Sequence, residues 1–225
     1  MAKSDIAILI VNGDVNTKFI EQYLNQLNFE PTIYCVDGAF NKIKYSKYIL
    51  SHTKAVIGDF DSADQKNLRK FYPEINTIET IDQDYTDTDK AISHVSRHYS
   101  KVIIFGISGG EMDHCLGNIS TILRWYKSIN IEFIDEYSKC FVTDENIELD
   151  NVIGKMISVV PLFFAENITY SGLKYKLQNE RLDFKTKIGT RNYAINDIIR
   201  ITFSAGILMI FVSHKLYHGY LEEIK

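Results

Sequence analysis

Acidic residues follow an apolar run in the segment Gly58-Asp59-Phe60-Asp61-Ser62. Asp59 and Asp61 are two residues apart, so an extended backbone places both carboxylates on the same side. Two carboxylates that face together need a cation, and Mg²⁺ suits them because it takes few protein ligands and keeps several waters. The segment therefore predicts a divalent metal site, although exposed acids beside a helix cap formed by Ser62 would give the same pattern.

A second acidic segment, Asp82 to Lys90, leads directly into a helical pattern. Thr86 and Asp89 form a start that resembles a capping box. Capping does not account for Asp87 and Lys90, which share the surface of the first helical turn. An acid for a metal and an amine for a phosphate are the groups that a nucleotide site requires.

A glycine-bearing loop connects an apolar run to a helical pattern in the segment Phe105 to His114. Glycines let backbone N–H groups approach an anion, and a helix N-terminus adds partial positive charge. The Gly-Lys-Ser/Thr ending of a Walker A loop is missing, as is the dinucleotide fingerprint. We therefore expect a phosphate-binding loop of another kind. Cys35-Val36-Asp37-Gly38 also ends an apolar run, but by itself it indicates only a turn.

The elements that must position these segments alternate between short apolar runs and helical patterns over the first 135 residues. Such alternation is typical of βαβ units with a mainly parallel sheet. The expected strands are residues 7–11, 32–36, 55–57, 77–81, 102–105 and 131–134. The expected helices are residues 17–27, 64–71, 88–99 and 113–127.

The pattern changes near residues 135–138, where helical periodicity gives way to short apolar runs. Strands are expected at residues 139–142, 152–159, 173–177, 198–203 and 207–212. Closely spaced short strands indicate an antiparallel sandwich or open barrel. We therefore expect an α/β domain over residues 1–136, followed by an all-β sandwich domain over residues 137–225.

The order of these segments strongly resembles the thiamin pyrophosphokinase family. The resemblance covers about the first 125 residues in detail, and the later residues resemble the family more loosely. It rests on the motifs Asp37-Gly38, Gly58-Asp59-Phe60-Asp61-Ser62, Asp82-Gln83-Asp84-x-Thr86-Asp87-x-x-Lys90-Ala91 and Gly109-Gly110-x-x-Asp113-His114-x-x-x-Asn118.

The resemblance implies an enzyme that moves a pyrophosphoryl group from Mg-ATP onto the hydroxyl of thiamin, giving thiamin diphosphate and AMP. It implies an α/β catalytic domain that binds the nucleotide and a β-sandwich domain that binds thiamin. It also implies a homodimer, in which thiamin lies between the α/β domain of one chain and the β domain of the partner.

The resemblance assigns roles to individual residues. Mg²⁺ would be held by Asp59, Asp61 and Asp87. ATP would be bound by Asp37, Ser62, Thr86, Lys90, Ser108, Gly109, Gly110, His114 and Asn118. Thiamin would lie near Gln83, Asp113, Asn192 and Met209. The catalytic set would be Asp59, Asp61, Asp87, Lys90 and Asp113, the last of which would orient the hydroxyl or accept its proton.

Composition excludes several classes of protein. The net charge is -4 and the sequence has no run of about five or more like charges, which argues against general nucleic-acid binding. The 3 cysteines show no CxxC spacing, so neither a disulfide framework nor a thiolate zinc site is expected. The apolar runs are far shorter than the roughly 20 residues that span a bilayer, and no signal peptide is recognised. A cytoplasmic protein without a membrane partner is therefore expected.

Two positions depart from the family pattern and leave other functions open. Glu111 stands where the family usually has Arg, and Arg191 where it usually has Ser. A relative that binds nucleotide or thiamin with little turnover is one alternative, and a metal-dependent nucleotide-sugar transferase is another. His94 and His98 have the spacing of metal ligands on a helix, but no third ligand is evident, so a zinc site is the weaker interpretation.

Overall fold

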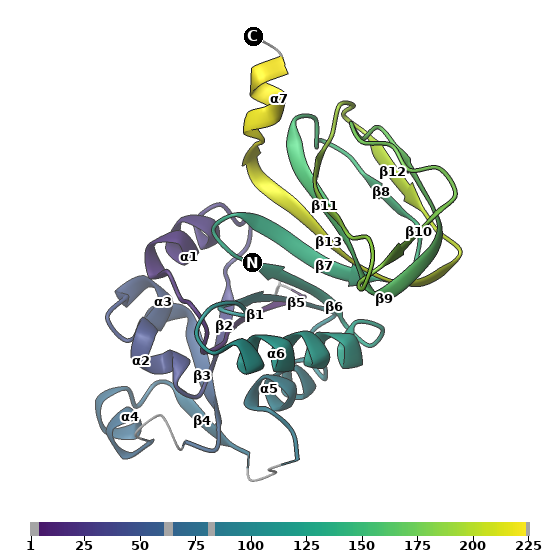
Figure 1. Cartoon of the computed structure of the whole chain (residues 1–225). Helices are drawn as coiled ribbons and strands as arrows, with labels where there is room; N and C mark the ends of the chain where they lie inside the picture. The colour runs from purple at the N-terminus through teal and green to yellow at the C-terminus, as the bar shows by residue number, and fades with distance from the viewer. Residues whose placement is uncertain (1–4, 61–64, 81–83, 224–225) are drawn as a thin grey trace. The chain divides into compact units, whose positions relative to one another are not determined.

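The computed structural model describes residues 5–60, 65–80 and 84–223. The chain separates into two compact units, Met1–Asp135 and Glu136–Lys225, which we call the N-terminal and C-terminal units (Figure 1). Each unit has a hydrophobic core of its own. The expected order, an α/β part followed by a β-rich part, is confirmed.

A parallel sheet forms the centre of the N-terminal unit. Its strand order is β4-β3-β2-β1-β5-β6, and each neighbouring pair is parallel. Isoleucine and valine dominate these strands, as is usual where helices cover both faces of a sheet. The bounds are β1 Ile6–Ile10, β2 Thr32–Val36, β3 Thr53–Gly58, β4 Asn76–Glu79, β5 Lys101–Phe105 and β6 Asn130–Ile134.

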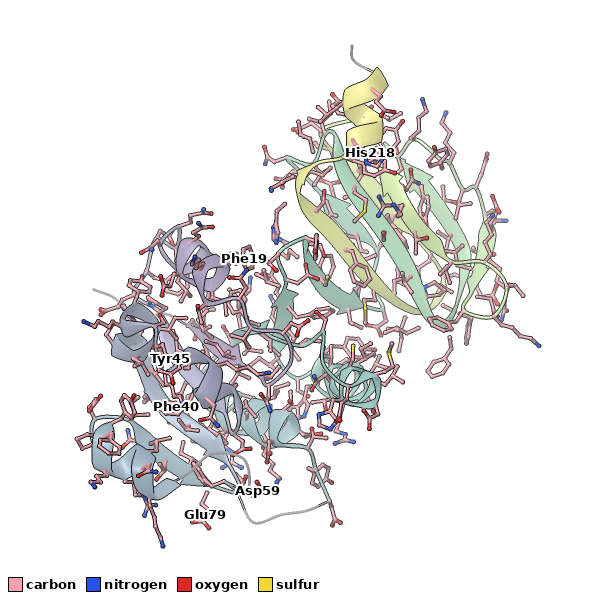
Figure 2. All side chains as sticks on the ribbon, turned by 60° about the vertical axis from the view of Figure 1, so that its left-hand side comes forward. Phe19, Phe40, Tyr45, Asp59, Glu79 and His218 are labelled. Atoms are coloured by element: carbon pink, nitrogen blue, oxygen red, sulfur yellow. The ribbon has the colours of Figure 1, made fainter. Side chains whose placement is uncertain are left out.

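Helices cover the two faces of this sheet (Figure 1). Ile8, Ile33 and Val56 point to the face that packs with α1, α2 and α3, where Phe40 of α2 is labelled in Figure 2. The alternate residues Leu9 and Ile57 point to the face of α5 and α6. The bounds are α1 Thr17–Leu24, α2 Ala39–Ile43, α3 Lys47–His52, α4 Gln65–Phe71, α5 Asp87–Val95 and α6 Met112–Trp125.

The strand order reverses direction between β1 and β5. The chain builds β1 to β4 outward on one side, and then places β5 and β6 on the other side of β1. In open α/β sheets, ligands bind beyond the carboxyl ends of the strands at such a reversal. The loops that follow β1 and β5 are therefore the part of this unit where a ligand site is expected.

Some element boundaries differ from those expected. Helix α5 ends at Val95 rather than residue 99, because the N–H groups of His98 and Tyr99 both bond to the Val95 carbonyl and close a turn. Helices α2 and α3 were not expected. They are 5 and 6 residues long, too short for a helical period to show in the sequence.

Antiparallel pairing builds the C-terminal unit. The path β7-β13-β9-β12-β8 carries β10 and β11 as further partners of β9. The bounds are β7 Ser138–Thr143, β8 Ile147–Leu149, β9 Lys155–Ser171, β10 Glu180–Asp183, β11 Gly189–Tyr193, β12 Ile199–Thr202, β13 Ala205–Leu216 and α7 His218–Glu223.

The strand expected at residues 173–177 is wrong. Leu173 forms only an isolated bridge, since Gly172 turns the chain with φ of 83°. Helix α7 was also not expected. Among the described residues, no helix has the length and apolar character needed to cross a membrane.

Candidate active site

Three carboxylates from three separate segments meet at the carboxyl ends of the strands. Asp37 follows β2, Asp59 follows β3 and Asp87 begins α5. One carboxylate oxygen of each lies within 4.8 Å of the others. Figure 2 shows Asp59 near Glu79, which ends the neighbouring strand β4. Three acids this close repel one another unless positive charge lies among them, which is the donor set of a divalent cation site.

Unusual backbone geometry brings Asp37 into this cluster. Its φ is 33° and it is buried, with only 6% of its surface exposed. A Cβ on Gly58 would lie 2.7 Å from the Asp37 Cβ, so only glycine fits at the end of β3. Strain of this kind persists where the surrounding structure requires it, and it is common at ligand sites.

The surroundings of Asp87 in this cluster shift the pKa of its carboxyl. Burial raises the pKa of its carboxyl, the hydrogen bond from Lys90 lowers it, and the charges of Asp59 and Asp37 raise it again, with a net upward shift. Lys90 Nζ lies 3.1 Å from Asp87 Oδ1 and bonds to the Thr80 carbonyl at 3.5 Å. A bound cation would offset the repulsion among the three carboxylates, so the residues present fit a metal ion.

Helix α5 begins as the sequence indicates. Thr86 is the N-cap, and its Oγ1 accepts the Asp89 N–H at 3.2 Å. The Asp89 carboxylate does not return to the cap, as it would in a capping box, but is buried against Arg124 and Trp125 of α6. The cap fixes where the helix starts, and therefore where Asp87 and Lys90 project.

The glycine-bearing loop adopts backbone angles that favour glycine. Gly106, Gly109 and Gly110 have φ of 77°, 83° and 70°. Glu111 is the N-cap of α6 but makes no side-chain capping bond, so the first N–H groups of this 14-residue helix have no cap from it. These N–H groups and the helix dipole favour an anion at this point.

We call Asp37, Asp59 and Asp87 the acidic cluster and residues 106–110 the glycine loop. A cavity of about 370 Å³ is lined by residues of both. Its lining comes from the segments 12–13, 36–38 and 86–88 and from residues within 109–118. Asp113 and His114 line it and are exposed, and the Asp113 carboxylate accepts the His114 N–H at 3.0 Å. Acids that could hold a metal and a loop that could bind phosphate therefore line the same cavity.

Polar contacts between α5 and α6 hold the two halves of the cavity together. Thr88 Oγ1 donates to Asn118 Oδ1 at 2.9 Å, and Asn118 Nδ2 donates to the Ile107 carbonyl at 3.1 Å. The hydroxyl groups of Thr86 and Thr121 lie 3.3 Å apart. Asn118 lines the cavity, and its amide holds the glycine loop through the Ile107 carbonyl. It can therefore act by positioning that loop.

The loop after β1 belongs to the cavity and was missed by the sequence analysis. The Gly13 N–H bonds to the Gly106 carbonyl at 2.8 Å, and Lys42 Nζ donates to the carbonyls of Asn12 at 2.8 Å and Gly13 at 2.7 Å. The signal was present, because Asn12-Gly13-Asp14 follows an apolar run as Asp37-Gly38 does. Lys42 gave no comparable signal, because its contacts are remote in sequence.

The expected thiamin-binding residues of the C-terminal unit are buried within it. Asn192 accepts the N–H groups of Tyr175 at 3.0 Å and Tyr193 at 2.9 Å, and donates to the Tyr175 carbonyl at 2.7 Å. Met209 is 4% exposed. Asn192 therefore fixes the turn at residues 173–175 with its amide. Asp61, Ser62 and Gln83 lie outside the described residues.

Comparison with known proteins identifies the family. Residues 23–133 match the family model described as thiamin pyrophosphokinase, catalytic domain, and residues 144–208 match the one described as thiamin pyrophosphokinase, vitamin B1 binding domain. The chain belongs to the thiamin pyrophosphokinase family. A thiamine pyrophosphokinase of Bacillus subtilis (strain 168) is 32% identical over 167 residues, which are 69% of this chain and 76% of that protein.

Other members of the thiamin pyrophosphokinase family agree with this assignment. The thiamin pyrophosphokinase 1 of Caenorhabditis elegans is 26% identical over 189 residues, covering 76% of this chain and 75% of that protein. A Bacillus subtilis thiamine pyrophosphokinase structure has a TM-score of 0.76 at 24% identity, covering 93% of this chain and 100% of that one. The yeast thiamin pyrophosphokinase structure has a TM-score of 0.78 at 16% identity, covering 100% and 90%. These two structural likenesses show the fold.

The two departures from the thiamin pyrophosphokinase pattern have local partners. Glu111 Oε2 lies 3.4 Å from His114 Nε2 on exposed surface. Arg191 has φ of 57°, and its guanidinium lies 5.4 Å from the centre of the Tyr217 ring. Each residue therefore makes a contact within its own unit.

Proposed function

We propose that this chain is a thiamin pyrophosphokinase, which transfers the pyrophosphoryl group of ATP to the hydroxyl of thiamin and releases AMP. One observation carries the proposal: the carboxylates of Asp37, Asp59 and Asp87 converge beside a cavity that the glycine loop also lines. The match of both family domain models supports the same reaction. A nucleotide-sugar transferase accounts for neither of those two matches.

The acidic cluster would hold Mg²⁺, the expected ion for carboxylate and phosphate oxygens. We propose Asp37 as a further ligand beside Asp59, Asp61 and Asp87. When bound, Mg²⁺ neutralises phosphate charge and fixes the direction of the triphosphate. The support is the spacing of the three carboxylates, together with the pKa of Asp87, which is raised chiefly by burial and further by the charges of Asp59 and Asp37.

The phosphates of ATP would lie along the glycine loop and the start of α6, with Ser108, Gly109 and Gly110 offering backbone N–H groups. Lys90, which pairs with Asp87 in the described structure, would neutralise charge that develops on the phosphates. Thr86, His114 and Asn118 would complete the nucleotide site, with Ser62 from outside the described residues.

The reaction forms one bond and breaks one. The thiamin hydroxyl oxygen attacks the β-phosphorus of ATP, the bond from that phosphorus to the bridging oxygen of the α-phosphate breaks, and AMP leaves with that oxygen. The hydroxyl proton passes to a base. We propose Asp113, because its exposed carboxylate lines the cavity beside the glycine loop.

Thiamin binding would involve the C-terminal unit, because residues 144–208 match the vitamin B1 binding model. Asn192 and Met209 remain our proposed contributors there, as does Gln83 outside the described residues. We also propose a homodimer in the cytoplasm, where ATP and Mg²⁺ are supplied. Exposed Phe163 and Phe184 on the C-terminal unit favour assembly, since large apolar side chains gain by being covered.

The decisive experiment incubates the purified protein with thiamin, ATP and MgCl₂ and measures nucleotides and thiamin esters together. We expect AMP and thiamin diphosphate in equal amounts. ADP with thiamin monophosphate would show transfer of a single phosphoryl group instead. Unchanged ATP in a folded protein that binds thiamin would show a binding relative without turnover.

A further inference from the structure

A second and larger cavity, of about 600 Å³, opens at the opposite ends of the strands from the candidate active site. Asp5 precedes β1, Lys54 and Ala55 are the second and third residues of β3, and Asn76 begins β4, so these lining residues lie at the amino ends of the strands. Ligand pockets of about 300–1,000 Å³ are typical for small molecules. Neither the family assignment nor the proposed reaction uses this cavity.

A small side chain in the sheet leaves the space for this cavity. Ala55 lies between Tyr34 on β2 and Asn76 on β4 in the strand register. A methyl group between two larger side chains leaves open space above it. Helix α5 covers β2 and β3 only as far as Val95, and His94 and His98 at its end line the space.

A β-bulge aims Lys54 at this hollow. The register of β2 against β3 shifts between the pairs Ile33–Thr53 and Tyr34–Ala55, which leaves Lys54 as the extra residue. Its ammonium lies 5.6 Å from the centre of the Tyr34 ring, and the His94 ring centre lies 5.7 Å from the same ring. Bulges re-aim side chains and are frequent next to binding sites. In the described part of the chain Lys54 has no carboxylate partner.

A buried hydroxyl proton in this cavity has no acceptor. The hydroxyl groups of Tyr34 and Tyr99 lie 3.3 Å apart, and both residues line the cavity while being 1% and 5% exposed. One hydroxyl donates to the other, so the second proton is left without an acceptor among the described residues. Burial and the bond to Tyr99 raise the pKa of Tyr34, which keeps it a donor.

The groups around the hollow are therefore mainly donors. Among the described residues, the single lining acid is Asp5, and its carboxylate accepts the Ser100 hydroxyl at 2.5 Å. We propose that this cavity binds the phosphoryl group of a small molecule, with Lys54, His98 and the free tyrosine hydroxyl proton as its donors. The aromatic walls formed by Tyr34 and His94 favour a phosphorylated molecule that also carries a ring.

The test follows the imidazole signals of His94 and His98 by NMR, assigned from His94→Gln and His98→Gln among the 6 histidines. The probes are phenyl phosphate, inorganic phosphate and phenol, each titrated separately. We expect saturable shifts with phenyl phosphate, weaker ones with inorganic phosphate and none with phenol. If inorganic phosphate bound as tightly as phenyl phosphate, the ligand would be the free ion, and the phenyl ring would contribute nothing to binding.

Two variants locate the site. Lys54→Met and Tyr34→Phe should each weaken phenyl phosphate binding by about tenfold, the loss expected for one hydrogen bond to a charged group. Lys70→Met is the matched control, because Lys70 lies over the Phe71 ring at 5.2 Å on α4, away from this cavity. The control should bind as the unaltered protein does.

The pKa of His94 gives an independent readout. The groups that face it are Tyr34, Lys54, Arg97, His98, Tyr99 and Asp5. Saturating phenyl phosphate should raise the His94 pKa, because a nearby anion favours the protonated ring. The proposal is overturned if the histidine signals do not move, or if only the amides of Gly109 and Gly110 respond, which would place the phosphate in the candidate active site.

Discussion

Trp125 donates an indole hydrogen bond of 2.9 Å to the carboxylate of Asp89, which is only 4% exposed. Arg124 pairs with the other oxygen of the same carboxylate. This contact joins α5, whose first turn carries Asp87, to α6, which follows the glycine loop. A buried acid with two donors therefore sets the spacing between the proposed metal-binding and phosphate-binding groups.

Asp89→Asn should lower the free energy of unfolding by about 1–3 kcal/mol, because it removes the charge of a buried carboxylate that pairs with Arg124 and accepts the Trp125 N–H. The catalytic groups are untouched, so kcat at saturating substrate should change less than KM for ATP. Urea unfolding and steady-state kinetics measure the two effects. Glu74→Gln, at an exposed carboxylate, is the control, and equal stability of the two variants would contradict a supporting role for Asp89.

Replacing any of Asp37, Asp59 and Asp87 by asparagine should reduce kcat/KM by about 10²–10³-fold, the range seen when one electrostatic group of a reaction site is lost. The same variants should weaken Mn²⁺ binding in an EPR titration without ATP. Glu79→Gln is the matched control, since Glu79 lies beside Gly58 in the strand register. If the Asp37→Asn variant bound Mn²⁺ with full affinity, Asp37 would not be a metal ligand.

Lys42→Met should raise KM for ATP by about three- to tenfold, because two charged hydrogen bonds to the loop after β1 are lost. The melting temperature should change little, as the lysine is exposed. Lys44→Met, two residues further along the chain, is the control, since the Lys44 ammonium bonds to Asn41 of α2 and lies over the ring of its neighbour Tyr45. An equal rise of KM for ATP in both variants would show that the loss of one positive charge, rather than the contacts of Lys42, causes the effect.

The pH dependence of stability should report His94, whose pKa is lowered from 6.5, chiefly by burial and then by His98, Arg97 and Lys54. A histidine with a depressed folded-state pKa contributes stability above its unfolded pKa and loses it as pH falls through the folded value. The protein should therefore lose stability below about pH 6.5, and His94→Gln should lose less. Thermal melts between pH 5 and pH 8 measure this.

His218→Gln is the control for that comparison, because His218 is exposed at the start of α7 (Figure 2). Its melting profile should follow that of the unaltered protein. Parallel profiles for the unaltered protein and His94→Gln would show that His94 does not couple to folding.

Local patterns predicted the fold well. Each expected strand of the N-terminal unit overlaps a strand of the sheet, because isoleucine-rich runs between helical patterns leave few other arrangements. In the C-terminal unit the pattern failed at residues 173–177. The segment Leu173-Lys174-Tyr175-Lys176-Leu177 looked like a strand, but the turn at Gly172 and the buried amide of Asn192 determine its path. Long-range hydrogen bonds of this kind leave no mark in a short window of sequence.

The sequence predicted those parts of the candidate site whose residues lie close together in the chain. The resemblance to the family grouped Asp59 with Asp87, because each belongs to a motif that lies within a short segment. Asp37 was assigned to ATP rather than to the acidic cluster, because its approach depends on a positive φ and on the missing side chain of Gly58. The contacts of Lys42 span 29 and 30 residues and could be found only from the structure.

The reversal of strand order between β1 and β5 has a consequence for synthesis of the chain. Strands β1 to β4 leave the ribosome first and can pair, but β1 then remains an open edge with the sequence Ile6-Ala7-Ile8-Leu9-Ile10. Only when residues 101–105 emerge can β5 cover that edge and bring the glycine loop to Gly13. An apolar open edge is a template for pairing with other chains. The period between synthesis of β1 and β5 is therefore when a nascent chain most needs protection by a chaperone.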